Sequence, residues 1–416
     1  MAVLLYAWDY GANRGHAVRD VVFNRSYNGS AKAYFVLQAG SESLYTRCSP
    51  KRLVLAPEPT TPPRSLTPES MAEIFWKLEA CDVRNLQRRV EAWLDILNKT
   101  KPSLVIYNHA PLAAIAAYCL GIPVLPIGTP FELSFFHETM PVFNNKPSIY
   151  EAAYLNAIQT VLQNLKAKPI QKTLDLCGLG AQEGLYLTCQ PFTDPYASNI
   201  TCVRNYIGTG LSDYGQPMAW TGNADTKKVF VYVNGKDSIA VKLLNVLNAD
   251  SWRKLHTRLE VIVYSPGIDP LLQQQLTHLR WSDKPVKLGP LWESMDVLIA
   301  SGGTTLYKAA EMAVPTIALP THQEQEIVAT QLVTKRLGAM IETSQTGVAI
   351  RHTLEMFLTT SDLRDDICQR LQRLNDRYDT TMFNDRRKLV DLFKHLGIKE
   401  PVVKSKHVPM DKEWLS

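Results

Sequence analysis

Two periods of apolar residues alternate along the chain. Short apolar runs predict β-strands, and between them apolar residues recur every three to four positions, which predicts amphipathic helices. In residues 83–99, for example, Leu86, Val90, Trp93, Leu94 and Leu97 share one helical face. The expected strands are 2–8, 31–38, 102–108, 122–128, 185–189, 202–208, 229–235, 259–267, 296–300 and 315–320. The expected helices are 71–80, 83–99, 111–121, 148–167, 238–248, 304–313 and 325–338, with three more in 347–397.

Strands that alternate with helices predict α/β units built on mainly parallel sheets. The pattern stops in residues 209–228, which are rich in Gly, Asn and Asp, and then restarts. We therefore predict two Rossmann-like domains, 1–208 and 229–398, joined by a linker at 209–228 and followed by a tail at 399–416. Because ligands bind beyond the carboxyl ends of parallel strands, both domains should present those ends to a cleft between them.

Composition narrows the class of protein. The chain has 416 residues, 45% hydrophobic and 20% charged, with a net charge of +5 that does not argue for nucleic acid as a partner. Its seven cysteines show no CxxC pair, which indicates reduced thiols in the cytoplasm. The N-terminus reads as a first strand and not as a signal peptide, and no apolar run is long enough for a membrane span. We see no convincing metal-binding motif and predict no metal.

A glycine turn at 301–305 is the most informative local motif. Ser301, Gly302, Gly303, Thr304 and Thr305 lie between an expected strand and an expected helix. The first turn of a helix has unpaired N–H groups and partial positive charge, so it is a site for anions. Glycines let a ligand approach the backbone, and the threonine hydroxyls add donors. The turn suits a diphosphate, although taken alone it is equally consistent with an ordinary strand-to-helix turn.

The residues that follow the turn favour a diphosphate site over an ordinary strand-to-helix turn, because together they resemble a known motif. The motif comprises Ser301-Gly302-Gly303, Lys308-Ala309, Ala313-Val314-Pro315, Pro320 and Glu324-Gln325. It resembles the donor-nucleotide motif of GT-B glycosyltransferases, particularly the family 1, UDP-glycosyltransferase-like group. The resemblance implies that the glycine turn holds the donor diphosphate and that Glu324 and Gln325 hold hydroxyls of the donor sugar. Gly235, after another expected strand, is a further candidate for approach to the phosphates.

The first domain resembles the same family more loosely. Gly11, Gly15 and His16 follow the first expected strand, where family members carry a glycine-rich loop and a histidine that is often the general base. A neutral imidazole can accept a proton from a hydroxyl at physiological pH. Gly15, His109 and Phe131 are candidates for acceptor contacts. For His109 the favoured interpretation is a polar residue at a strand end, and Phe131 is at least as well explained by packing in the core or on a surface loop.

Two positions depart from the family pattern. Lys308 stands where the family has an acid that binds ribose hydroxyls, and a lysine cannot accept hydrogen bonds. Glu311, one helical turn on, could pair with Lys308 or replace that acid in part. Asn108 stands where an aspartate often orients the catalytic histidine. An asparagine can select the imidazole tautomer but cannot stabilise an imidazolium, so Asn108 should weaken base catalysis.

The sequence therefore predicts a GT-B glycosyltransferase. It would move a sugar from a UDP- or dTDP-type donor to an unknown acceptor, with inversion, with no further cofactor, and with His16 as the base. A nucleotide-sugar epimerase or hydrolase of the same fold and a catalytically inactive helper protein remain alternatives. A dinucleotide oxidoreductase is disfavoured because no GxGxxG motif follows a strand.

Overall fold

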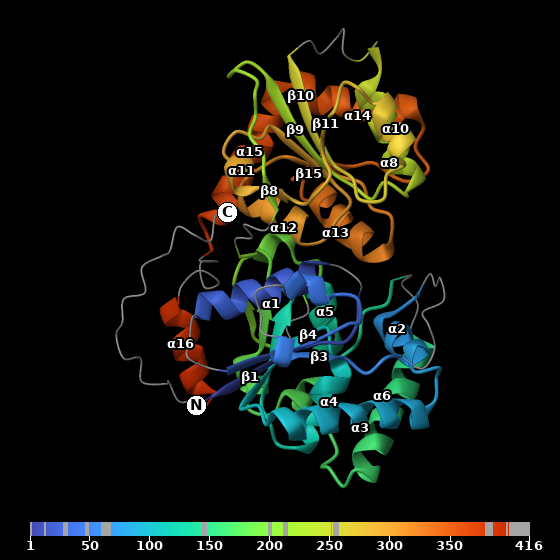
Figure 1. Ribbon diagram of the computed structural model, residues 1–416, viewed down its shortest axis with the longest axis vertical. Helices are drawn as coiled ribbons and strands as arrows, with labels where there is room; N and C mark the ends of the chain where they lie inside the picture. The colour runs from blue at the N-terminus through green and yellow to red at the C-terminus, as the bar shows by residue number, and fades with distance from the viewer. Residues whose placement is uncertain are drawn as a thin grey trace.

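Two α/β units stacked on each other make up the protein (Figure 1). The structure is a computed structural model. It describes residues 2–11, 14–27, 32–45, 50–59, 68–143, 148–198, 202–210, 215–250, 252, 258–378, 386–396 and 398. The expected α/β class, with two Rossmann-like units, is confirmed, because within these ranges the strands form one larger parallel sheet in each unit.

The first unit holds a seven-stranded sheet in the order β3-β2-β1-β4-β5-β6-β7, counted over the described residues. Its strands are β1 (Val3–Trp8), β2 (Lys32–Leu37), β3 (Leu53–Leu55), β4 (Leu104–Asn108), β5 (Val124–Gly128), β6 (Leu185–Leu187) and β7 (Arg204–Tyr206). Its helices are α1 (Arg14–Tyr27), α2 (Met71–Leu78), α3 (Val83–Thr100), α4 (Pro111–Cys119), α5 (Pro130–Leu133), α6 (Ile149–Asn164) and α7 (Gly180–Glu183). Short 3₁₀ turns cover Glu42–Tyr45, Pro50–Arg52, Ser134–Phe136, Thr173–Cys177 and Pro191–Thr193.

Both faces of this sheet are buried, as expected for parallel strands between helices. Successive side chains of β1 point to opposite faces. Leu5 and Ala7 pack in the cluster that includes residues of α2, α3, α4 and α6, whereas Tyr6 and Trp8 pack in the cluster that includes residues of α1. The sheet is therefore a fixed platform, and its loops at the carboxyl ends of the strands are free to carry functional groups.

The second unit holds a six-stranded parallel sheet in the order β11-β10-β9-β13-β14-β15, again over the described residues. Its strands are β9 (Lys227–Tyr232), β10 (Leu259–Tyr264), β11 (Arg280–Ser282), β13 (Val297–Ala300), β14 (Thr316–Ala318) and β15 (Gly338–Met340). Its helices are α8 (Ser238–Asn248), α10 (Pro270–Gln275), α11 (Gly289–Trp292), α12 (Thr304–Glu311), α13 (Gln323–Thr334), α14 (Gly347–Thr359) and α15 (Ser361–Asn375).

In each unit the strand order reverses beside the first strand. The chain winds outward from β1 to β3 and then returns to place β4 on the other side of β1, and β9 and β13 repeat this arrangement. Such a reversal leaves a crevice at the carboxyl ends of the two central strands, which is where ligands bind in this class of fold. Loops after β1 and β4 flank one crevice, and loops after β9 and β13 flank the other.

The connection between the units is partly structured. Within the expected linker 209–228, β8 (Gln216–Pro217) pairs with β12 (Val286–Lys287), and β9 already begins at Lys227. The pattern missed β8 because a strand of two residues has no periodicity. The domain boundaries stay predictions, and the tail at 399–416 lies outside the described residues.

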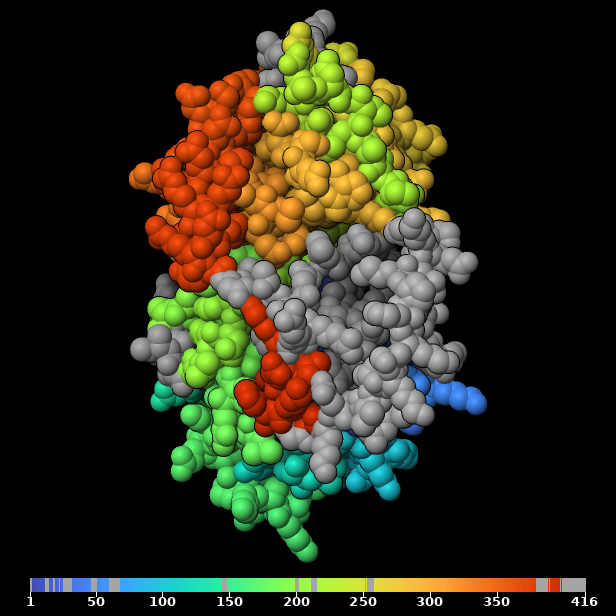
Figure 2. Space-filling view, turned by 90° about the vertical axis from the view of Figure 1, so that its left-hand side faces the viewer, coloured from blue at the N-terminus to red at the C-terminus, as the bar shows by residue number. Residues whose placement is uncertain are grey.

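The last described helix, α16 (Arg386–His395), returns to the first unit. Phe393 meets Phe23 of α1 edge to face at a ring distance of 6.1 Å, and Leu392 and Leu396 join the same buried cluster as β1. Figure 2 shows this segment in red against the first unit, below the orange-red α14 and α15 of the second. Although α16 falls within the stretch 229–398 assigned to the second domain, it packs on the first.

Glu311, at the end of α12, ties the units together near the linker. Its carboxylate accepts hydrogen bonds from Gln190 Nε2 at 3.0 Å, Thr209 N at 2.9 Å and Thr209 Oγ1 at 2.7 Å. Asn375 of α15 donates to the backbone oxygens of Ala310 and Glu311 at 3.0 Å each. The carboxyl end of α12 is thus held both by the linker and by the helix that precedes the return to the first unit.

Candidate active site

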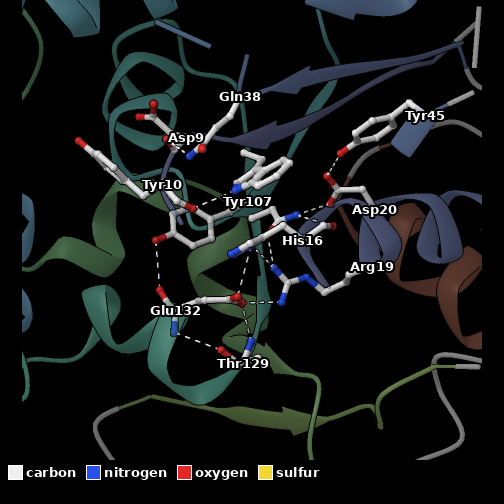
Figure 3. A network of polar contacts seen from close by, with 12 residues as sticks. Asp9, Tyr10, His16, Arg19, Asp20, Gln38, Tyr45, Tyr107, Thr129 and Glu132 are labelled. Atoms are coloured by element: carbon white, nitrogen blue, oxygen red, sulfur yellow. Dashed lines mark hydrogen bonds and ion pairs between the residues drawn. The ribbon is translucent and has the colours of Figure 1, made fainter. Parts of the chain in front are cut away.

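His16, Arg19, Asn108 and Glu132 come from three different segments and meet at the carboxyl ends of β1, β4 and β5. His16 and Arg19 lie on α1 and Glu132 lies on α5 (Figure 3). Asn108 is the last residue of β4. The sequence analysis named His16 and Asn108, and the structure brings them into direct contact. The sequence analysis did not identify Arg19 and Glu132 as site residues. Arg19 is one helical turn after His16, but nothing in the sequence alone indicates that Glu132 turns towards the same ring.

The imidazole of His16 is held in one tautomer. Its Nδ1 lies 2.7 Å from Asn108 Oδ1. The amide nitrogen of Asn108 donates to the backbone oxygen of His16 at 3.1 Å and to Asp20 Oδ1 at 2.7 Å. Since these two acceptors fix the orientation of the amide, Asn108 Oδ1 must accept and His16 Nδ1 must carry the proton. The lone pair is then on Nε2, which has no hydrogen bond among the described contacts.

Gly11 leaves space beside Nε2. It has a φ of 88°, and a Cβ added to it would lie 2.7 Å from His16 Nε2. Any other residue would therefore cover the nitrogen that carries the lone pair, so glycine is required here for access as well as for backbone conformation. Aromatic rings pack on the imidazole ring itself. The ring centre of Trp8 lies 5.1 Å from that of His16 in a stacked arrangement, and the ring of His109 lies nearly parallel at 5.9 Å.

Burial keeps both histidines neutral. It lowers the pKa of His16 below 6.5; the Glu132 carboxylate opposes this shift, and Arg19 adds to it. Burial also lowers the pKa of His109, to about 4. His109 adopts a left-handed backbone conformation with a φ of 54°, and its buried Nε2 has no hydrogen-bond partner. His109 therefore lies beside His16, and its contact with an acceptor stays a prediction.

The surroundings of Glu132 favour the charged form of its carboxyl group. Burial alone would raise the pKa of its carboxyl, but Arg19, His16 and His109 together lower it to about 2. Arg19 NH1 lies 2.5 Å from Glu132 Oε2, and Arg19 NH2 donates to Asn108 Oδ1. The cluster thus holds one carboxylate, one guanidinium and a neutral imidazole in close contact.

Asp20, behind Asn108, should make stability depend on pH. Burial raises its pKa to about 7. An acid with a raised pKa in the folded state costs stability once the pH exceeds its unfolded pKa, ~3.9. We expect the Asp20→Asn variant, which can keep the hydrogen bonds to Asn108 and Tyr45, to be no more stable than wild type near pH 4. Its advantage should grow as the pH rises to 7, to about 1–3 kcal/mol.

Urea unfolding at pH 5 and pH 8 measures this effect. The exposed Asp95 of α3 provides the matched control, since Asp95→Asn should change stability equally at both pH values. A difference between the Asp20→Asn variant and wild type that does not vary with pH would show that Asp20 has an ordinary pKa.

In the second unit, the glycine turn lies between β13 and α12 as predicted. Gly303 precedes α12 with a φ of 67°, and no side chain caps the helix. Its first N–H groups therefore have no partner within the helix. Ser301 Oγ is buried and has no hydrogen-bond partner among the described residues. Buried hydroxyls are normally paired, so this one indicates a place for a polar ligand or water.

Gln325, of the predicted Glu324-Gln325 pair, lies against this turn. A Cβ added to Gly302 would lie 2.4 Å from Gln325 Cγ, so the Gln325 side chain packs directly on the glycine backbone. Gln325 Oε1 accepts from Thr321 N at 2.9 Å and from Thr321 Oγ1 at 3.2 Å, which leaves its amide nitrogen to donate elsewhere. Loss of solvent raises the pKa of Glu324 to about 7, and the charge of Glu132 in the other unit adds to the shift.

The two parts of the site face each other across the units. A Cβ added to Gly15 would lie 3.7 Å from Thr304 Oγ1, so the first turns of α1 and α12 are neighbours. Gln323 Nε2 also donates to the backbone oxygen of Phe143 at 3.5 Å. The residue next to His16 therefore lies directly opposite the glycine turn.

The remaining predicted site residues are less well supported. Lys308 pairs with Glu311, whose carboxylate is already occupied by Gln190 and Thr209, so Glu311 does not replace the missing acid. The N–H of Gly235 donates to Pro266 O at 2.9 Å, and a Cβ there would lie 2.4 Å from Ile268, so packing alone accounts for the glycine. Its contact with the donor stays a prediction. Phe131 precedes Glu132 and stacks on Phe143 at 5.8 Å.

No protein-family model and no curated protein matches the sequence, but solved structures do resemble the fold. CalG4, the calicheamicin glycosyltransferase, aligns with a TM-score of 0.64 and 14% identity over 95% of this chain and 98% of its own. The spinosyn rhamnosyltransferase SpnG, complexed with thymidine diphosphate, aligns with a TM-score of 0.63 and 14% identity over 95% and 100%. SnogD, a glycosyltransferase from Streptomyces nogalater, aligns with a TM-score of 0.63 and 14% identity over 94% and 100%.

These likenesses cover nearly the whole of each chain, so they confirm the expected GT-B fold for both units together. Among the described residues, no helix combines the length and apolar character needed to cross a membrane. No group of three or more His, Cys, Asp or Glu side chains within the same ranges could hold a metal ion.

Proposed function

We propose that this protein transfers a sugar from a nucleoside diphosphate donor to a hydroxyl group of an acceptor. One observation carries the proposal: the uncapped first turn of α12 lies directly opposite the start of α1, beside the histidine that has a free Nε2. An anion site and a general base thus face each other across two units that share the GT-B fold.

The proposed reaction is a single displacement with inversion. The acceptor hydroxyl gives its proton to His16 Nε2 as its oxygen forms a bond to the anomeric carbon of the sugar. The bond from that carbon to the diphosphate oxygen breaks, and the diphosphate leaves with the bonding electrons. Backbone N–H groups of α12 and the dipole of that helix stabilise the negative charge that develops. Burial keeps His16 neutral and therefore able to accept the proton near pH 7.

The donor would lie with its diphosphate on the glycine turn and its sugar against Glu324 and Gln325. A carboxylate and an amide can together pair with neighbouring sugar hydroxyls. SpnG binds thymidine diphosphate, which supports dTDP- or UDP-sugars as the first donors to test. Ribose recognition must differ from the family pattern, because Lys308 is not an acceptor and Glu311 is engaged with the other unit.

A screen of dTDP-, UDP- and GDP-sugars by thermal shift tests the donor site. A ligand that binds only the folded state raises the melting temperature by an amount that grows with the logarithm of its free concentration relative to its Kd. Product analysis then separates the candidate activities, since a hydrolase releases free sugar, an epimerase changes the donor itself, and a transferase gives a glycosylated acceptor. Absence of any stabilisation by all donors at millimolar concentration would contradict the proposed function.

The Gly302→Ala variant should bind the donor at least about fivefold more weakly. Its new Cβ would meet Gln325 Cγ at 2.4 Å, so the glutamine must leave the glycine turn and its contacts with Thr321. Loss of one or two hydrogen bonds costs about 1–3 kcal/mol, which corresponds to roughly a five- to 150-fold loss of affinity. Calorimetric titration with the best donor from the screen measures this change.

Gly347→Ala is the matched control for this substitution. Gly347 also begins a helix of the second unit, but a Cβ there would meet only Val246 Cγ2 at 3.8 Å. The control should bind the donor as wild type does. Equal affinities for wild type and the Gly302→Ala variant would mean that the donor does not use this turn.

A further inference from the structure

The protonated form of His16 needs a negative charge that Asn108 cannot supply. Once His16 accepts a proton, both ring nitrogens carry hydrogen and the ring is a cation in a buried site. Asn108 is neutral and can only accept the Nδ1–H hydrogen bond. Asp20 is behind Asn108, and its raised pKa of about 7 leaves it partly protonated at neutral pH.

Glu132 is the carboxylate that lies against the ring. Its Oε1 is 3.4 Å from His16 Nδ1, and the side chains of the two residues are only 9% and 6% exposed. Figure 3 shows it entering the cluster from the side opposite α1. A buried opposite charge at this distance favours the charged form of an imidazole.

Local structure holds this carboxylate in place without help from His16. Glu132 is the third residue of α5 and forms a capping box with Thr129, whose backbone N–H donates to Glu132 Oε2 at 2.8 Å. A Cβ on Gly128 would lie 2.6 Å from the same oxygen, so only glycine lets the carboxylate fold back onto β5. A glutamine at position 132 could keep the capping box, since that motif accepts either residue.

Arg19 reduces the electrostatic effect of the Glu132 carboxylate on the His16 imidazole. It pairs with Glu132 and at the same time places NH2 at 3.3 Å from His16 Nδ1. The guanidinium therefore opposes protonation of His16 both directly and by neutralising Glu132. His109 lies on the other side of the ring, and Glu324 of α13 faces the Arg19–Glu132 pair from the second unit.

We propose that Glu132 is the positioning residue of His16, that it balances the charge of the imidazolium in place of the acid missing at Asn108, and that Arg19 limits this effect. The role in catalysis rests on the proposed function. The electrostatic coupling between the three side chains does not, and it can be measured without any substrate.

Two substitutions should move the pKa of His16 in opposite directions. Glu132→Gln removes the carboxylate and leaves Arg19 beside the ring, so the pKa of His16 should fall by about one unit or more. Arg19→Met removes the guanidinium and frees Glu132, so the same pKa should rise by a similar amount. A merely structural role of either residue would not produce opposite signs.

NMR titration of ¹³C-labelled histidine measures these shifts in the full chain. The resonance of His16 is the one of nine histidine signals that disappears in a His16→Gln variant. Glu138→Gln, at an exposed position of the same unit, is the control and should leave the pKa of His16 unchanged. A pKa of His16 that is unchanged or raised in a folded Glu132→Gln variant would overturn the inference.

Kinetics then separates this inference from the proposed function. With a working donor and acceptor, Glu132→Gln should lower kcat about 10–100-fold, leave the KM for the donor unchanged and shift the acidic limb of the kcat profile to lower pH. If no donor and acceptor react but the NMR shifts occur, the proposed function fails and the coupling stands. If transfer occurs and Glu132→Gln leaves kcat and the pH profile unchanged, the inference fails and the function stands.

Discussion

Replacing His16 by alanine should lower kcat for sugar transfer by about 10²–10⁴-fold, the usual contribution of a positioned general base. The KM for the donor should change little, because the donor is expected to contact α12 and α13 and not the imidazole. Since a base works only when deprotonated, wild-type kcat should fall as the pH drops through the pKa of His16. Burial places that pKa below 6.5, so activity should persist under mildly acidic conditions.

Steady-state kinetics of the His16→Ala variant, together with donor titration, checks this expectation. His352→Ala replaces an exposed histidine on α14 and should retain wild-type kcat. Because loss of the ring also removes its stacking on Trp8, the melting temperature and the donor affinity of the variant show whether the fold is intact. A folded variant that binds the donor and keeps full kcat would remove His16 from the reaction.

Replacing Arg89 by methionine should destabilise the protein by about 3–5 kcal/mol, as breaking a buried ion pair from one side usually does. Arg89 is 2% exposed and bridges two fully buried carboxylates, Asp9 at 2.7 Å and Glu79. It also donates to Tyr10 Oη and Pro57 O, both at 2.8 Å. Methionine fills a similar volume but leaves both acids without a cation.

The loss of stability caused by Arg89→Met should be larger at pH 8 than at pH 5. Burial raises the pKa of Asp9 to about 7 even with Arg89 present, so acid neutralises the unpaired carboxyl and alkali ionises it. Urea unfolding of the variant at both pH values gives the comparison. Arg84→Met is the control on the same helix: the Arg84 side chain is 92% exposed, and its loss should cost no more than about 0.5 kcal/mol. If Arg89→Met lowered the free energy of unfolding by less than about 1 kcal/mol, Arg89 would not stabilise the protein by pairing with Asp9 and Glu79 as expected.

The parts of the fold that repeat a period could be predicted from the sequence. The apolar stripe of residues 83–99 became α3, and the runs at 102–108 and 229–235 became β4 and β9. These elements bury one face or both, and burial leaves a periodic trace in the sequence. Short elements such as β3, β8 and α5 leave no such trace, because two to four residues are too few to show a period.

The candidate site likewise contains residues that could be predicted from the sequence and residues that could not. The glycine turn could be predicted as an anion site from local chemistry, whereas the role of Gln325 beside it came from the resemblance to a family. The contact between His16 and Asn108 spans 92 residues and came only from the resemblance to a family. Glu132 was missed because its capping box with Thr129 explains it locally, and only the packing of β5 beside β4 shows that its carboxylate reaches His16.

The two ends of α12 differ. Its carboxyl end is held by hydrogen bonds, whereas its first turn has no side-chain cap. Thr209 of the linker and Asn375, which precedes the return of the chain to the first unit, both hold its carboxyl end. The linker and the helix that precedes the return to the first unit therefore meet at one pivot, the carboxyl end of α12. Eight residues of helix place the glycine turn about 12 Å from that pivot. A small rotation of the two units about this point would accordingly move the glycine turn past Gly15 by more than it moves the carboxyl end of α12.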